Sequence, residues 1–108
     1  MKKRIYISGA VSDIPENIYK AKFKKAEEFL KGLGYEVFNP VESEIIQETF
    51  RKYGYDACLA KCIEKLSYCH CIFMLEGWTK SGGALAEKAY AKACKKDVIY
   101  ECSNNYGE

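Results

Sequence analysis

Residues 71–93 read CIFMLEGWTKSGGALAEKAYAKA, which places an apolar run, a glycine-containing loop and an alanine-rich stretch in close succession. The five apolar residues 71–75 are typical of a strand that is covered on both faces of a parallel sheet. Residues 81–83, Ser-Gly-Gly, open a helix that we expect over residues 84–93. A buried strand followed by a helix predicts an alternating α/β fold with residues 71–75 as an interior strand.

The rest of the chain continues this alternation. Short apolar runs predict strands at residues 4–7, 35–38 and 98–100, and helical periodicity predicts helices at about 15–33, 42–53 and 56–66. We expect Asp13 to cap the first helix and Gly34 to end it. Short connections between parallel strands imply helices on both faces. The sequence therefore predicts one domain over residues 1–108, a Rossmann-like or flavodoxin-like three-layer sandwich with a short parallel sheet of about four strands.

Composition limits the classes of protein to which the chain can belong. Its net charge is only +2, and lysines alternate with glutamates in its first third, which argues against a nucleic acid polymer as partner. No run approaches the roughly 20 apolar residues of a membrane span. The first residues also lack the pattern of a signal peptide. We therefore expect a cytoplasmic protein that does not bind membranes.

The six cysteines raise the questions of disulfides and of a metal site. They lie in apolar, periodic segments of a chain expected in the cytoplasm, so we expect core positions and reduced thiols. Cys58, Cys62, Cys69 and Cys71 are close enough in sequence to surround a zinc ion, but their spacing matches no standard zinc pattern. Cys58 and Cys62 can equally be explained as small buried apolar side chains. We expect no metal, and a structural role for His70, the only histidine.

The candidate binding residues follow the strands. Ligands of parallel sheets bind at the carboxyl ends of the strands, so we expect a substrate site formed by the end of the first strand (Tyr6, Ser8, Gly9), by Asn39 and by the loop 76–83. The chain has neither a dinucleotide fingerprint nor a phosphate-loop lysine, so we expect no cofactor. Within the loop, Ser81, Gly82 and Gly83 bring a hydroxyl and backbone amides to a helix amino terminus, which suits a polar ligand, although Ser81 as a plain helix cap remains an alternative. Trp78 could stack on a planar ligand or cover the end of the sheet.

Two carboxylates are the candidate catalytic groups. Glu87 lies about a turn and a half into its helix, and helical side chains lean toward the amino terminus, so its carboxylate can point at the site. Its alanine-rich surroundings would either desolvate it, as catalysis requires, or leave it exposed without a role. Asp56 is the second candidate, and its alternative role is the amino cap of its helix.

With these residues the chain resembles the nucleoside 2-deoxyribosyltransferase superfamily, in particular a branch of small bacterial and phage proteins. The resemblance covers nearly the whole chain and rests on residues 5–9, on residues 34–40 and, most specifically, on residues 74–78 and 81–84 together with Glu87. It implies that Glu87 is the nucleophile, that Asp56 is an acid ahead of the third strand and that Ser81 lies in a loop that contacts the substrate.

These observations predict an enzyme that acts on the N-glycosidic bond of a nucleoside or nucleotide, either a deoxyribosyltransferase or an N-glycoside hydrolase. Retaining exchange at an anomeric carbon uses a carboxylate nucleophile and a second acid about 5 Å away, which Glu87 and Asp56 could supply. The alternatives are a non-catalytic nucleotide- or nucleoside-binding module and an interaction protein without a ligand.

We also expect a homodimer or a higher homo-oligomer. So small a sheet leaves apolar helix surface to be covered, at Phe50, Tyr53 and Tyr90. The resemblance implies sites that are completed across subunits, and the tail at residues 104–106 could reach a neighbouring subunit's site.

Overall fold

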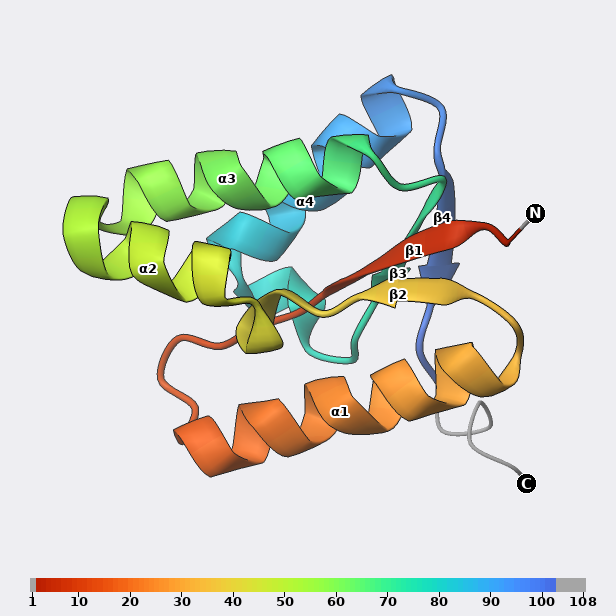
Figure 1. The fold of residues 1–108 in the computed structure, drawn as a ribbon, viewed down its shortest axis with the longest axis horizontal. Coiled ribbons are helices and arrows are strands. Elements are labelled where there is room, and N and C mark those ends of the chain that lie inside the picture. Colours follow the sequence, from red (N-terminus) through yellow and green to blue (C-terminus); the bar gives the residue numbers. More distant parts are fainter. Residues whose placement is uncertain (1, 103–108) are drawn as a thin grey trace.

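The computed structural model describes residues 2–102, in which strands and helices alternate (Figure 1). The strands are β1 (Arg4–Ser8), β2 (Glu36–Phe38), β3 (Cys71–Met74) and β4 (Asp97–Tyr100). The helices are α1 (Glu16–Gly32), α2 (Glu44–Tyr53), α3 (Tyr55–Ser67) and α4 (Gly82–Ala93), with short 3-10 helices η1 (Pro40–Glu42) and η2 (Trp78–Lys80). Residues 104–106, the predicted reach to a neighbour, lie outside the described residues. Within residues 2–102, none of the helices has the length and apolar character needed to cross a membrane.

The four strands form one parallel sheet in the order β2-β1-β3-β4. The prediction that β3 is an interior strand is confirmed, and all four of its residues are buried. From β1 the chain goes first to β2 on one side and later to β3 on the other. The carboxyl ends of β1 and β3 therefore meet at the point where the strand order reverses, and Ser8 pairs in register with Met74 there. Parallel α/β sheets bind their ligands at such a point.

Helices cover both faces of the sheet, as predicted (Figure 1). Side chains alternate between the two faces of a strand. In β1, Ile5 and Ile7 therefore pack toward α1, while Tyr6 packs toward the side of α2, α3 and α4. This confirms the three-layer α/β sandwich, and it places every second residue of β1 on the face that carries α4.

The helix ends correct one prediction and confirm another. Asp13 does not cap α1: the residue before the helix is Pro15, which makes no side-chain cap bond, and Asp13 itself has a positive φ of 63° in the preceding turn. Gly34 ends α1 as predicted, with a φ of 99° that L side chains rarely adopt. Gly54, with a φ of 86°, joins α2 directly to α3.

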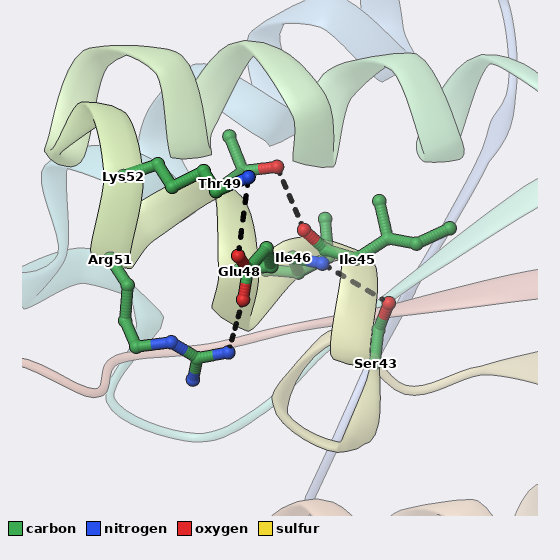
Figure 2. A network of polar contacts seen from close by, with 7 residues as sticks. All are labelled: Ser43, Ile45, Ile46, Glu48, Thr49, Arg51 and Lys52. Atoms are coloured by element: carbon green, nitrogen blue, oxygen red, sulfur yellow. Dashed lines mark hydrogen bonds and ion pairs between the residues drawn. The ribbon is translucent and has the colours of Figure 1, made fainter.

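Polar contacts along its own length stabilise α2 (Figure 2). The Ser43 hydroxyl accepts a hydrogen bond from the backbone N–H of Ile46 at 3.4 Å and caps the helix. One turn further on, Glu48 forms ion pairs with Arg51 and Lys52. Pairs at this spacing each contribute a few tenths of a kcal/mol, so they stabilise the second half of α2, while the Ser43 cap fixes the residue at which α2 begins.

The cysteines are divided between the layers. Cys71 packs on the α1 side of the sheet, whereas Cys62 and Cys69 pack on the opposite side, so they cannot surround one ion. Within residues 2–102 no three histidine, cysteine or acidic side chains are close enough to hold a metal. Cys94 and Cys102 are exposed, which corrects the expectation of core positions for these two.

His70 has the structural role that we expected. Its Nδ1 accepts a hydrogen bond from the backbone N–H of Arg4 at 3.0 Å, and its own backbone N–H donates to the Arg4 carbonyl at 2.8 Å. These bonds align the start of β3 with β1.

The arrangement makes a prediction about stability. Phe73 is completely buried in the centre of β3 and faces Phe29 of α1, so Phe73→Ala should lower the free energy of unfolding by about 3–5 kcal/mol. The control is the same substitution at Phe50, which is 53% exposed on α2 and should cost about 1 kcal/mol or less. Urea denaturation measures both, and equal losses would contradict the assigned position of β3.

Candidate functional site

A buried carboxylate lies at the carboxyl end of β1. Glu87 of α4 is only 7% exposed. The Tyr6 hydroxyl donates to its Oε2 at 2.8 Å, and the Ser8 hydroxyl donates to its Oε1 at 2.6 Å. Tyr6 and Ser8 are two residues apart in β1 and so point to the same face of the sheet, where α4 brings Glu87 to meet them. Both oxygens of the carboxylate thus have a partner.

The environment shifts the protonation of these groups. Burial raises the pKa of Glu87 above its ordinary value, and the hydrogen bonds from Ser8 and Tyr6 oppose that shift. Burial also raises the pKa of the Tyr6 phenol, with a further contribution from the nearby Glu87 charge. Tyr6 therefore keeps its proton at neutral pH and acts as a donor to the carboxylate.

Glu87 lines a cavity of about 350 Å³ at this end of the sheet, within the size range of small-molecule sites. Much of its wall is apolar and comes from α1, η1, α2 and α3. Among the described lining residues, Glu87 is the one acid and Lys80 the one cation. The cavity thus has the composition of a small-molecule site, in which apolar walls surround a few polar groups.

The cavity brings together most of the residues predicted from the sequence. Those that line it are Tyr6, Ser8, Gly9, Ser81, Gly82, Gly83 and Glu87. They come from the end of β1 and the first turns of α4, the two elements that meet at the reversal of strand order.

Two of these residues also have structural roles. Ser81 caps α4, because its Oγ accepts a hydrogen bond from the Ala84 N–H at 3.1 Å. At Gly9, a Cβ atom would lie 2.9 Å from Leu75 Cδ1, so glycine allows the close approach of the segment that follows β3. Ser81 therefore both caps α4 and lines the cavity.

Three predicted site residues do not line the cavity. Asp56 is exposed in the first turn of α3, and it is not the cap of that helix, because Gly54 occupies the cap position. The side chain of Asn39 is used within the fold: its Oδ1 accepts from the Val41 N–H at 3.2 Å, and its Nδ2 donates to Glu27 at 3.0 Å.

Trp78 is the third of these residues, and its ring is occupied by neighbours. The Lys88 ammonium lies 4.4 Å from the centre of the Trp78 ring, and the Tyr100 ring lies 5.8 Å away. Of the two alternatives for Trp78, this position favours covering the end of the sheet.

Sequence reasoning missed the contribution of α3 to the site. Tyr55, Cys58, Leu59 and Cys62 line the cavity on one face of this helix. Their helical spacing can be seen in the sequence, but the same spacing is typical of a helix face that packs in the core. Further along α3, Leu66 does pack in the core. Burial raises the pKa of the Cys62 thiol to about 12, so this thiol remains protonated beside Tyr6.

This geometry allows Glu87 to act as a nucleophile or as a hydrogen-bond acceptor. Two donors fix the orientation of its carboxylate, and a cavity in front of it admits a small molecule. A second carboxylate for acid catalysis is missing among the described lining residues. Any protonation of a leaving group must therefore come from a hydroxyl, a thiol, Lys80 or water.

The buried carboxylate makes stability depend on pH. Because the pKa of Glu87 is raised in the folded protein, the folded chain keeps this proton to a higher pH than the unfolded chain. The contribution of Glu87 to the free energy of unfolding should therefore fall as the pH rises from about 4.3, the ordinary glutamate value, through the raised pKa. Glu87→Gln cannot ionise, so urea denaturation of the variant should lack this fall. Parallel curves for the two proteins would contradict burial as the dominant effect.

The comparison with known proteins places the chain in a family. A search of curated proteins gives no match. The family described as a domain of unknown function, DUF4406, matches residues 3–100. This match includes β1, with Tyr6 and Ser8, and α4, with Glu87. The chain therefore belongs to the DUF4406 family.

Proposed function

We propose that the protein is an enzyme that acts on the N-glycosidic bond of a nucleoside or nucleotide, as a deoxyribosyltransferase or an N-glycoside hydrolase. The observation that carries the proposal is the buried Glu87 carboxylate, held by Tyr6 and Ser8 at the wall of a cavity of about 350 Å³. The resemblance of residues 74–78 and 81–84, together with Glu87, to nucleoside 2-deoxyribosyltransferases supports the choice of substrate. We also propose that the protein is cytoplasmic, as we expect from the sequence.

Glu87 performs the first step of the proposed reaction. A carboxylate oxygen attacks the anomeric carbon, a C–O bond forms, and the C–N bond breaks with its electron pair leaving on the base. Water or a second base then attacks the same carbon, the C–O bond to Glu87 breaks, and the attacking molecule gives up its proton to the departed base or to solvent. Attack by water is hydrolysis, and attack by a second base is transfer. Tyr6 and Ser8 hold the carboxylate in one orientation during both steps.

One observation favours a non-catalytic nucleoside- or nucleotide-binding module as a second candidate. Retaining glycosidases use two carboxyl groups about 5 Å apart, and Asp56, which we predicted as the second group, is exposed and outside the cavity. In a binding module Glu87 would accept a hydrogen bond from a ligand hydroxyl or amine instead of attacking carbon.

Substitution of Glu87 tests the enzyme proposal. Glu87→Gln removes the attacking charge with little change of shape, so release of free base from a panel of nucleosides and nucleotides should fall by roughly 100-fold or more, while ligand binding is largely kept. Chromatography of the released base measures the first quantity, and calorimetric titration measures the second.

The matched control is Glu48→Gln, which changes an exposed glutamate on α2 that is paired with Arg51. It should leave base release unchanged. Equal turnover by wild type and Glu87→Gln would rule out Glu87 as the nucleophile. Binding without cleavage by the wild type, with water or any added base as acceptor, would replace the enzyme by the binding module.

We further propose a homodimer or higher homo-oligomer. Phe50 and Tyr53 near the end of α2 are 53% and 73% exposed, respectively, and such apolar surface favours association. Tyr90, the third residue expected there, is instead partly buried against the core on the α4 side. Light scattering at micromolar concentration should give at least twice the chain mass, and Tyr53→Asp should shift it toward the monomer. A monomer mass for the wild type would exclude the proposal.

A further inference from the structure

The Tyr55 side chain reaches the amino terminus of α4 from α3. Tyr55 lines the same cavity as Glu87. A Cβ atom added to Gly83 would lie 3.1 Å from the Tyr55 hydroxyl oxygen and 3.9 Å from Ser81 Oγ. The hydroxyl therefore rests against the first turn of α4, where a Cβ at position 83 would make an unusually tight contact with it.

The same contact relates Tyr55 to the carboxylate. Gly83 and Glu87 are four residues apart in α4, so they lie on one face of the helix, about 6 Å apart along its axis. The Glu87 side chain leans toward the amino terminus of α4, that is, toward Gly83. The phenol and the carboxylate thus both line the cavity on the side of the first turns of α4.

Tyr55 is also free to bind a ligand. Its side chain is 53% exposed, and its hydroxyl has no hydrogen-bond partner among the described residues. The buried hydroxyl of Tyr6, in contrast, is already bonded to Glu87. Of the two phenols that line the cavity, only Tyr55 can offer its proton to an incoming molecule.

Asp56, one residue further along, points elsewhere. Successive residues of an α-helix differ by about 100° in direction. α3 begins at Tyr55, directly after the cap residue Gly54, and it turns the face with Tyr55, Cys58 and Cys62 to the cavity. In that orientation Tyr55 lines the cavity and Asp56 is exposed outside it.

We infer that Tyr55 contacts the departing base and takes the place that the sequence suggested for Asp56. The inference rests on the proposed function and specifies how the site binds its substrate. As Glu87 attacks the anomeric carbon, the C–N electron pair moves onto the base. The Tyr55 hydroxyl donates a hydrogen bond to the base nitrogen or oxygen that gains this charge, and the base takes its proton from water at the open side of the cavity.

The test is Tyr55→Phe, compared with Tyr53→Phe. Each substitution removes one hydroxyl, but Tyr53 is 73% exposed and does not line the cavity. For a nucleoside whose base leaves as an anion, kcat/KM of Tyr55→Phe should fall by about 10-fold or more. For a nucleoside with an N7-methylated purine, which leaves without negative charge, the loss should shrink to about 3-fold or less, because little charge needs stabilising. Tyr53→Phe should match the wild type on both substrates.

Dependence on the leaving group separates a contact with the base from a purely structural effect. A structural loss would be equal for the two substrates and would overturn the inference. Equal activity of Tyr55→Phe and Tyr53→Phe would overturn it as well, while a large loss in Glu87→Gln would leave the proposed function intact.

Binding measurements decide the outcome if the wild type does not cleave. The Kd of Tyr55→Phe for the bound nucleoside should then be about 3- to 10-fold higher than that of Tyr53→Phe, as expected for one lost hydrogen bond. An unchanged Kd overturns the contact. If the wild type neither binds nor cleaves any nucleoside or nucleotide of the panel, the proposed function and this inference fall together.

Gly83→Ala provides a second variant. The added Cβ would press on the Tyr55 hydroxyl at 3.1 Å, so it should lower kcat/KM in the wild type but have little effect in the Tyr55→Phe background. Losses that multiply in the double variant would show that the hydroxyl does not act from this position, and they would overturn the inference.

Discussion

The site depends on one buried carboxylate with two hydroxyl donors. Burying a charge is unfavourable unless hydrogen bonds replace water, and Tyr6 and Ser8 supply one bond to each oxygen of Glu87. The three side chains come from two elements whose meeting depends on the whole topology, because α4 follows β3 in the chain and β3 pairs with β1. The carboxylate is therefore satisfied only when the sheet is correctly assembled.

The fold was readable from the sequence because its signals are local. Five apolar residues in a row could only suit a strand covered on both faces, and β3 is the interior strand. Gly34 ended α1 where the sequence predicted, since a positive φ favours glycine. The cap at Asp13 failed for a physical reason: Pro15 occupies the cap position immediately before the helix, and Asp13 lies two residues ahead of that position.

The site was readable only in part. Residues at the ends of β1 and the start of α4 could be placed, because the carboxyl ends of parallel strands meet at one edge of a sheet. The direction of a side chain at a helix start was harder to predict, since it depends on how the whole helix packs. Asp56 and Tyr55 are neighbours in sequence, and Tyr55 lines the cavity because it shares the packed face of α3 with Cys58 and Cys62. The sequence favoured Asp56 because a carboxylate is a common catalytic group, and nothing in the pattern distinguished Tyr55 from the other tyrosines.

The apolar face of α3 is a second part of the site that the sequence pattern could not fully predict. Cys58, Leu59, Cys62 and Leu66 share one helical stripe, yet Cys58 and Leu59 line the cavity, Leu66 is part of the core, and Cys62 belongs to both. Periodicity identifies the side of a helix that faces the interior, but it does not distinguish a packed core from the wall of a cavity. The difference lies in the position along α3. Toward its carboxyl end α3 packs on the sheet through Leu66, and toward its amino end it lines the cavity together with the end of β1 and residues of α4. The cavity therefore lies at one edge of an otherwise closely packed sheet, where Tyr6, Ser8 and Glu87 meet.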